Sequence, residues 1–302
     1  MRLRVRRSAR LDDLESRLVW ILGGPRTGST WLLNLLVHPH TARAVPINEP
    51  YLGVHLAPLV SARPGAVISA AEWRANDSSY FFDQRQAAVW RPHLRRLILE
   101  RFAAQAGLAG PEHSGRDRLV VVKEPNGSEA APILLSTLPR SRLLFLLRDP
   151  RDVLDSQLDA VSCGSWMAGD ADPEGVATES GRIDYLSRHA ALWLYRIEAV
   201  ERATAAHAPE LVMTVRYEEL RSDTAAVMRS IASWLEVEVG DAGIADAVRA
   251  NAFEELPPEV RGPGKALRLA TPGAWRENLS PGEQAAIMEI VGDKLTELGY
   301  RA

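Results

Sequence analysis

The sequence has little cysteine and no long apolar run near its start, and each scarcity excludes a class of protein. A single cysteine, Cys163, rules out an internal disulfide framework and a cysteine-rich metal site. The apolar run after the basic N-terminus, Leu18 to Leu22, is far too short for a signal peptide or a membrane span. We therefore expect a cytoplasmic chain with no stable membrane anchor. The net charge of −3 gives no reason to expect nucleic acid as a partner.

Lysine is also scarce, with only three in 302 residues, and it is missing from a position where its absence is informative. Residues 19–31, VWILGGPRTGSTW, form an apolar run, a glycine-bounded loop and the start of a helix. The spacing from Gly23 to Gly28 nearly matches a nucleotide P-loop, but Ser29 occupies the lysine position and the cation is Arg26. Backbone N–H groups and the helix N-terminus still favour an anion there. The sequence predicts a phosphate loop without the lysine that grips β- and γ-phosphates.

Composition and hydrophobic patterning predict the fold class. Hydrophobic residues make up 46% of the chain and charged residues 25%, as in an ordinary globular protein. Four nearly continuous apolar runs are typical of parallel strands buried on both faces, and helical patterns lie between them. We expect a single-domain α/β protein with a P-loop-like, doubly wound parallel sheet flanked by helices. The predicted strands are Val19–Leu22, Leu119–Val122, Leu143–Leu147 and Leu211–Val215, and the predicted helices are Thr30–Val37, Asp152–Ala160 and Tyr185–Ala206.

Polar and charged motifs follow several of these strands directly. The glycine loop, Lys123-Glu124-Pro125 and Arg148-Asp149-Pro150 all come at strand carboxyl ends, where doubly wound sheets bind ligands. We expect them to converge. Two segments look less like scaffold: residues 50–115 carry several aromatics, and residues 162–182 are rich in Gly, Ser and acidic residues, which predicts a mobile loop.

A second motif surrounds Arg148. Asp149 and Pro150 are typical of a helix N-cap and first turn, and Ser156 lies eight residues beyond Arg148 on the helix that follows. Asp152 and Ser156, four residues apart, share one helix face. From these residues alone, Arg148 either binds an anion or pairs with Asp149 or Asp152 in a structural turn.

Two further motifs lie towards the C-terminus. RYEEL, which contains Tyr217, ends the fourth predicted strand. RLATPGAWRENL, residues 268–279, is a locally basic loop that leads into a helix start at Ser280-Pro281. Alone, this loop is typical of a solvated charged surface.

In this order the four motifs resemble the superfamily of sulfotransferases that use 3′-phosphoadenosine-5′-phosphosulfate (PAPS), over roughly residues 19–300. PRTGSTW resembles the 5′-phosphosulfate loop of that family, RDPRDVLDS its 3′-phosphate motif, Tyr217 a tyrosine near the adenine, and Arg268 with Trp275 its C-terminal Arg-to-Trp spacing. Trp31 either stacks on the base or packs in the core. The cofactor-binding residues that the resemblance implies are Arg26, Thr27, Gly28, Ser29, Thr30, Trp31, Arg148, Ser156, Tyr217 and Arg268.

The resemblance implies in-line transfer of a sulfuryl group from PAPS to a hydroxyl of a small-molecule, natural-product or carbohydrate acceptor, leaving 3′-phosphoadenosine-5′-phosphate (PAP). Arg26 can neutralise the charge on the leaving phosphate, so no metal is expected. The resemblance leads us to expect one sulfotransferase domain over residues 1–302. Its parts are the loop and helix at 19–40, substrate-facing insertions at 50–115 and 162–182, and a cofactor loop at 261–280.

The acceptor hydroxyl needs a base. Many members of the family use a histidine two residues after a strand-end lysine, and here that position, counted from Lys123, is Pro125. Glu49, in VPINEPYLG after the first helix, resembles the Glu-Pro of carbohydrate sulfotransferases and is the favoured base. Glu124 is the next choice, followed by His55 or another residue. Lys123 either stabilises the transferring group or pairs with Glu124.

Two alternatives remain open from the sequence. A P-loop kinase would need the missing lysine after Gly28 and a strand ending in a Walker-B Asp, which we do not find. An inactive nucleotide-binding module would keep Arg26, Arg148 and Ser156 but would not need Glu49. The Arg-rich composition indicates a bacterial enzyme, and a homodimer is possible.

Overall fold

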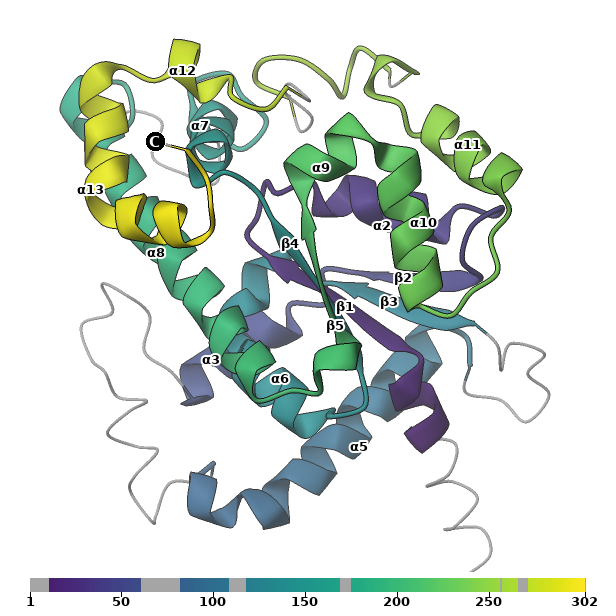
Figure 1. The fold of residues 1–302 in the computed structure, drawn as a ribbon. Coiled ribbons are helices and arrows are strands. Elements are labelled where there is room, and N and C mark those ends of the chain that lie inside the picture. Colours follow the sequence, from purple (N-terminus) through teal and green to yellow (C-terminus); the bar gives the residue numbers. More distant parts are fainter. Residues whose placement is uncertain are drawn as a thin grey trace, which may run out of the picture.

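The computed structural model describes residues 11–60, 82–108, 118–168, 175–255, 257–265 and 271–301. Strands and helices alternate along this part of the chain (Figure 1). The strands are β1 Leu18–Gly23, β2 Ala44–Asn48, β3 Leu119–Lys123, β4 Arg142–Leu147 and β5 Val212–Arg216. The helices are α2 Ser29–Val37, α3 Leu52–Val60, α5 Ala87–Gln105, α6 Ala131–Thr137, α7 Pro150–Val161, α8 Glu179–Ala205, α9 Tyr217–Ser222, α10 Thr224–Trp234, α11 Asp241–Ala250, α12 Trp275–Asn278 and α13 Pro281–Glu297.

The five strands form one parallel sheet in the order β2-β3-β1-β4-β5. From the central strand β1 the chain goes first to the edge strand β2, returns to β3 beside β1, and then crosses to β4 and β5 on the other side of β1. This is the doubly wound arrangement expected from the apolar runs, and it places the ligand-binding edge at the strand carboxyl ends. Three of the runs correspond to β1, β3 and β4. The fourth strand begins at Val212, one residue later than predicted, because Pro209–Leu211 form a short 3₁₀ turn.

The sequence did not predict the edge strand β2. Its residues, AVPIN, are only partly buried and carry Pro46 in the middle, so they form no continuous apolar run. Proline lacks an N–H and is tolerated in a sheet mainly on edge strands. Among the residues that the structure describes, β2 pairs with β3 alone, with Asn48 opposite Lys123. Glu49 therefore follows an edge strand at the ligand-binding edge, rather than coming directly after the first helix.

Alternation along β1 divides the core into two layers. Leu18, Trp20 and Leu22 pack in a cluster with residues of α5, α6, α8 and α13. Val19 and Ile21, on the opposite face, pack in a second cluster with residues of α2, α10 and α11. Figure 1 shows these helix groups on the two sides of the sheet. Both faces of the sheet are covered, which explains why the central strands are apolar throughout.

Helix starts follow the local sequence signals. The Asp149 carboxylate accepts the Arg151 N–H at 2.9 Å, with Pro150 in the first turn of α7, so the predicted N-cap is confirmed. At α13, Ser280 and Glu283 form a reciprocal capping box. Within the residues described, no helix is both long and apolar enough to cross a bilayer.

The two segments predicted to lie outside the scaffold contain regular structure. Residues 179–182, assigned to a mobile loop, form the first turn of α8 because Thr178 caps it. Residues 50–115 contain α3 and α5. Trp90 on α5 is buried with its ring edge-on to Phe82 at 5.6 Å, so this aromatic belongs to the core and does not face an acceptor. Trp73, Tyr80 and Phe81 lie outside the described residues.

Candidate active site at the carboxyl edge of the sheet

The glycine loop joins β1 to α2, and two side-chain hydroxyls hydrogen-bond to its backbone. The Gly23 N–H donates to Ser128 Oγ at 2.9 Å, and the Thr27 hydroxyl donates to the Gly24 carbonyl at 2.7 Å. Gly28 has a φ of 88°, and a Cβ there would lie 2.6 Å from a ring carbon of Tyr217. Only glycine allows the Tyr217 ring this close to the loop. The loop and Tyr217 therefore form one surface at the start of α2.

Arg148 lies beside this surface as a buried cation. It donates from Nη1 to the Arg26 carbonyl at 2.9 Å, and its guanidinium lies 4.4 Å from the centre of the Tyr217 ring. Its Nε is buried with no hydrogen-bond partner among the residues that the structure describes. The alternative in which Arg148 pairs with Asp149 in a turn is wrong, because Asp149 binds Arg151 at 2.8 Å. The Arg148 charge does act on Asp152, but the hydrogen bonds of that carboxylate go to backbone N–H groups.

Asp152 has a different task, which the sequence did not reveal. Its carboxylate is buried and accepts the backbone N–H groups of Gly273 at 2.7 Å and Trp275 at 3.3 Å. Burial raises the pKa of Asp152 above its ordinary value, and these N–H groups and the Arg148 charge lower it in part. Asp152 thus holds the end of the C-terminal loop on α7. Arg268, predicted to bind the cofactor from this loop, lies outside the described residues.

Arg26 and Ser156 meet directly. The Arg26 Nε donates to Ser156 Oγ at 3.0 Å, across the gap between the glycine loop and α7. The sequence predicted Arg26 at one anion site and Ser156 at another, separate one. In the structure the side chains of the two motifs are in contact. The donor set at this edge fits a phosphate ester. It consists of the Arg148 Nε, the Arg26 guanidinium, the Ser156 hydroxyl and the backbone of the glycine loop.

Two contacts hold the Trp31 side chain in place. Its indole N–H donates to the Asn251 carbonyl at 3.0 Å, and its ring meets the Tyr217 ring edge-on at 6.0 Å. The residue is neither fully buried nor free to rotate, so the choice between base stacking and core packing stays a prediction. The indole connects the first turn of α2 to Asn251 at the end of α11.

Lys123 and Glu49 face each other at the ends of neighbouring strands. Because Asn48 pairs with Lys123 in the β2–β3 register, Glu49 comes next to the lysine, and Lys123 Nζ lies 2.7 Å from Glu49 Oε1. The lysine also donates to Thr30 Oγ1 at 2.9 Å. Its side chain is 4% exposed and that of Glu49 is 26% exposed. The expected alternative, a Lys123–Glu124 pair, is wrong. A buried ammonium instead joins Glu49 to the phosphate loop.

The Tyr51 hydroxyl donates to Glu49 Oε2 at 3.4 Å. The negative charge of Glu49 raises the pKa of Tyr51 above its usual value. Tyr51 is half exposed, so it borders the open side of the Glu49 carboxylate.

Glu124 is placed unlike Glu49. It is fully buried, and neither carboxylate oxygen has a hydrogen-bond partner in the described part of the chain. Burial raises the pKa of Glu124 to about 7, and the nearby Leu52 and Tyr51 N–H groups lower it only in part. Gly53 and Gly127 close over it, since a Cβ on Gly127 would lie 2.8 Å from Glu124 Oε1. An acceptor hydroxyl has no open path to this carboxyl, whereas Glu49 is accessible.

Glu124 should make the stability of the protein pH-dependent. Its folded pKa of about 7 lies above the ordinary value of 4.5, so the folded state binds the proton more tightly than the unfolded state. The stabilisation is present below about pH 4.5 and is lost as the pH rises through about 7, on the order of 3 kcal/mol in total. Glu124→Gln should flatten this part of the dependence of unfolding free energy on pH, measured by urea denaturation. An identical slope in wild type and variant would contradict this.

Trp166 is a site residue that the sequence did not single out. It is half exposed, and the Arg26 guanidinium lies 5.7 Å from its ring centre. Its backbone N–H donates to the Gly264 carbonyl at 3.1 Å, which joins the segment after α7 to the start of the loop at 261–280. The available signal was weak, since one aromatic in a Gly- and Ser-rich segment is ordinary.

Comparison with known proteins shows the family and the fold of the chain. The sulfotransferase family matches residues 19–241. Among solved structures, mouse sulfotransferase SULT7A1 complexed with PAP is similar with a TM-score of 0.55 at 15% identity, covering 93% of this chain and 85% of that one. The sulfotransferase domain of the Synechococcus PCC 7002 olefin synthase gives 0.52 at 16% identity, covering 94% and 95%.

A retinol dehydratase in complex with androsterone and the inactive cofactor PAP gives a TM-score of 0.50 at 16% identity, covering 95% of this chain and 83% of that one. No curated protein sequence matches the chain. At these sequence identities the similar structures establish only the fold, whereas the match to the family model establishes family membership. The chain belongs to the sulfotransferase family.

Proposed function

We propose that this sulfotransferase moves the sulfuryl group of PAPS to a hydroxyl of a small-molecule acceptor, with Glu49 as the general base. One observation carries the proposal: buried Lys123 contacts both Glu49, at 2.7 Å, and Thr30 of the phosphate loop, at 2.9 Å. In-line transfer needs the nucleophile and the leaving oxygen on opposite sides of the transferred group. The Lys123 ammonium lies between the proposed base and the anion site, as such a reaction requires.

Glu49 accepts the proton of the acceptor hydroxyl. Its carboxylate is open to solvent on one side and fixed on the other by Lys123, so it can receive a hydroxyl without losing its orientation. A positioned base of this kind contributes about 10²- to 10⁴-fold to a rate. Lys123, held at the same point, stabilises negative charge that develops during transfer. Glu124 is enclosed and acts on this pair only through its charge.

The donor is held by the glycine loop, Arg26, Arg148 and Ser156. PAPS supplies an activated sulfuryl group when bound, and its 3′-phosphate is the anion for which the buried Arg148 Nε has a free donor. When PAPS binds, Arg26 exchanges its Ser156 contact for the 5′-phosphosulfate, and Ser156 is then free to contact the 3′-phosphate. The Tyr217 ring, which packs against Gly28 and Arg148, offers a flat face for the adenine.

We place the acceptor beside Glu49. Tyr51, whose hydroxyl contacts Glu49, and Trp166, whose ring lies near Arg26, are both half-exposed aromatics that it could contact. We infer an acceptor that combines a hydroxyl with apolar surface. The androsterone in the retinol dehydratase complex is a molecule of this kind, and it supports the inference by analogy.

Isothermal calorimetry tests the donor assignment. Wild-type protein should bind PAP without a metal ion, and should bind it more tightly than AMP, which lacks the 3′-phosphate that Arg148 contacts. ATP with Mg²⁺ is the control for a kinase-type site. Tighter binding of ATP that depends on Mg²⁺ would overturn the assignment, and equal affinities for PAP and AMP would remove the 3′-phosphate site.

A further inference from the structure

A cluster of three metal-binding side chains lies outside the site described above, where the turn after α2 meets α11. His38 and His40 flank Pro39 in that turn, and Asp246 is on α11. One nitrogen of each histidine and one oxygen of Asp246 lie within 4.8 Å of one another. Figure 1 shows α2 and α11 on the same side of the sheet.

The distances within the cluster approach those of a metal site. His40 Nδ1 lies 2.6 Å from Asp246 Oδ2, and His38 Nε2 lies 4.0 Å from the same oxygen. Two ligands of one tetrahedral zinc ion, each about 2.0–2.1 Å from it, lie about 3.3–3.4 Å apart. The two histidine–aspartate distances lie on either side of this value, so His40 would move away from Asp246 and His38 towards it when an ion binds. Two imidazoles and a carboxylate are donors that Zn²⁺ and neighbouring transition-metal ions accept.

An ordinary hydrogen bond explains only part of the cluster. The His40–Asp246 contact is a surface pair of a common kind, but it does not require a second imidazole beside the same oxygen. Arg249 occupies the other oxygen of Asp246, which leaves Oδ2 for the histidines. His38 Nδ1 accepts the His40 N–H at a long 3.4 Å, and a metal on Nε2 would require the loss of this weak contact.

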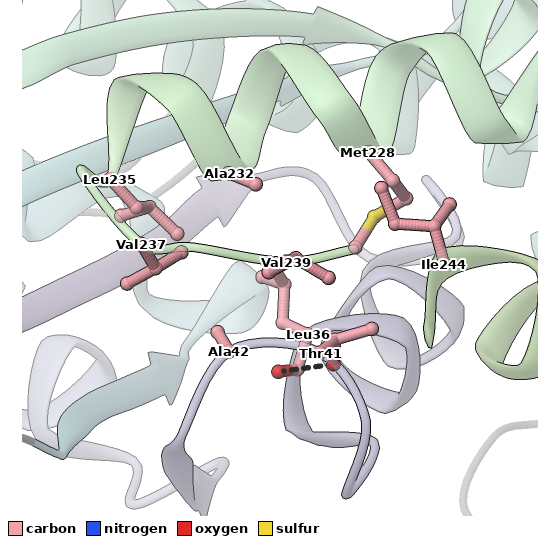
Figure 2. Close-up of a pocket in the computed structure, with 9 residues that line it drawn as sticks. All are labelled: Leu36, Thr41, Ala42, Met228, Ala232, Leu235, Val237, Val239 and Ile244. Atoms are coloured by element: carbon pink, nitrogen blue, oxygen red, sulfur yellow. Dashed lines mark hydrogen bonds between the residues drawn. The ribbon is translucent and has the colours of Figure 1, made fainter. Parts of the chain in front are cut away.

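The backbone around the cluster is closely fitted. A Cβ on Gly243 of α11 would lie 2.2 Å from the His40 carbonyl oxygen, so a glycine is needed where α11 crosses the turn. A small apolar pocket lies between α10, the first turns of α11 and the segment from the end of α2 to Ala42 (Figure 2). Its lining residues are Leu36, Thr41, Ala42, Met228, Ala232, Leu235, Val237, Val239 and Ile244. A metal bridge at the cluster would strengthen the contact of α11 with the turn.

We propose that His38, His40 and Asp246 bind a divalent transition-metal ion, with water completing its coordination, and that this ion fastens α11 to the end of α2. The ion has no part in sulfuryl transfer. It supports the donor site from behind, because α11 ends next to Asn251, whose carbonyl accepts the Trp31 indole N–H. The probe for this site is Zn²⁺, with Mg²⁺, which prefers oxygen ligands, as the ion that should not bind.

The test uses the full chain, prepared without a histidine tag and treated with a chelator. Calorimetry should show one zinc ion per chain, and zinc but not Mg²⁺ should raise the melting temperature. His40→Ala and Asp246→Asn should each weaken zinc binding by about tenfold or more. His93→Ala, which removes an exposed histidine on α5, is the matched control and should leave zinc affinity unchanged.

Cobalt gives a second readout that does not depend on stability. Co²⁺ bound by two imidazoles and a carboxylate should give visible absorption bands in the wild type, and zinc should displace it. These bands should be absent from His40→Ala while circular dichroism shows that the variant is folded. Zinc affinity that is equal in wild type and both cluster variants would overturn the proposal, as would wild-type protein that binds no zinc.

Discussion

Replacing Glu49 by glutamine should lower kcat for sulfuryl transfer by about 10²- to 10⁴-fold, the contribution of a positioned general base. Glutamine keeps the shape of the side chain and can still accept the Lys123 hydrogen bond, but it cannot take a proton from the acceptor hydroxyl. PAP affinity should change by only a few-fold, because the donor contacts of Arg26, Arg148 and Ser156 are untouched. Steady-state kinetics and calorimetry on the same preparation separate the two effects.

Tyr51→Phe is the matched control for Glu49→Gln. It removes the hydroxyl that lies 3.4 Å from Glu49 and leaves the carboxylate in place, so kcat should stay within a few-fold of wild type. Because Lys123 is buried, thermal unfolding should be checked in the Glu49 variant. A folded Glu49→Gln protein with unchanged kcat would remove Glu49 from the proton transfer.

Replacing Arg148 by alanine should weaken PAP binding by about 2–4 kcal/mol, the effect of losing a charged hydrogen-bonding partner. This is roughly a 30- to 700-fold rise in Kd. The buried guanidinium has an unused Nε donor and lies against the Tyr217 ring, so both charge and donor geometry are lost. AMP, which lacks the 3′-phosphate, should lose much less affinity than PAP when both are titrated by calorimetry.

Two further variants define this result. Arg148→Lys keeps the charge but not the planar donor set, so PAP affinity should fall between wild type and alanine. Arg229→Ala removes an exposed arginine that pairs with Asp241 on the surface, and it should change nothing. Equal losses for PAP and AMP in the Arg148→Ala protein would mean that Arg148 supports the loop and does not read the 3′-phosphate.

Much of the scaffold could be predicted because its signals are local. The buried strands β1, β3 and β4 are continuous apolar runs, and the start of α7 is encoded by Asp149 and Pro150. β2 has no such signal. Its partly exposed residues and Pro46 are acceptable only because it lies at the sheet edge, and that position depends on the pairing with β3.

The sequence predicted which charged and polar residues lie at the strand ends, but it did not predict which side chains they contact. Lys123 pairs with Glu49 and not with its neighbour Glu124 because the β2–β3 register brings the carboxylate across the sheet edge. The burial of Glu124 under Gly53 and Gly127 depends on how α3 packs, which no local pattern specifies. The Arg26–Ser156 contact likewise depends on the distance between the glycine loop and α7.

Transfer of radiolabelled sulfate from PAPS to a panel of hydroxylated acceptors tests the account most directly. The account predicts that label enters at least one acceptor that combines a hydroxyl with apolar surface, that PAP forms in equal amount, and that Glu49→Gln protein binds PAP but transfers almost no label. Contradiction would come from wild-type protein that binds PAP yet labels no acceptor, or from Glu49→Gln protein that labels acceptors at the wild-type rate.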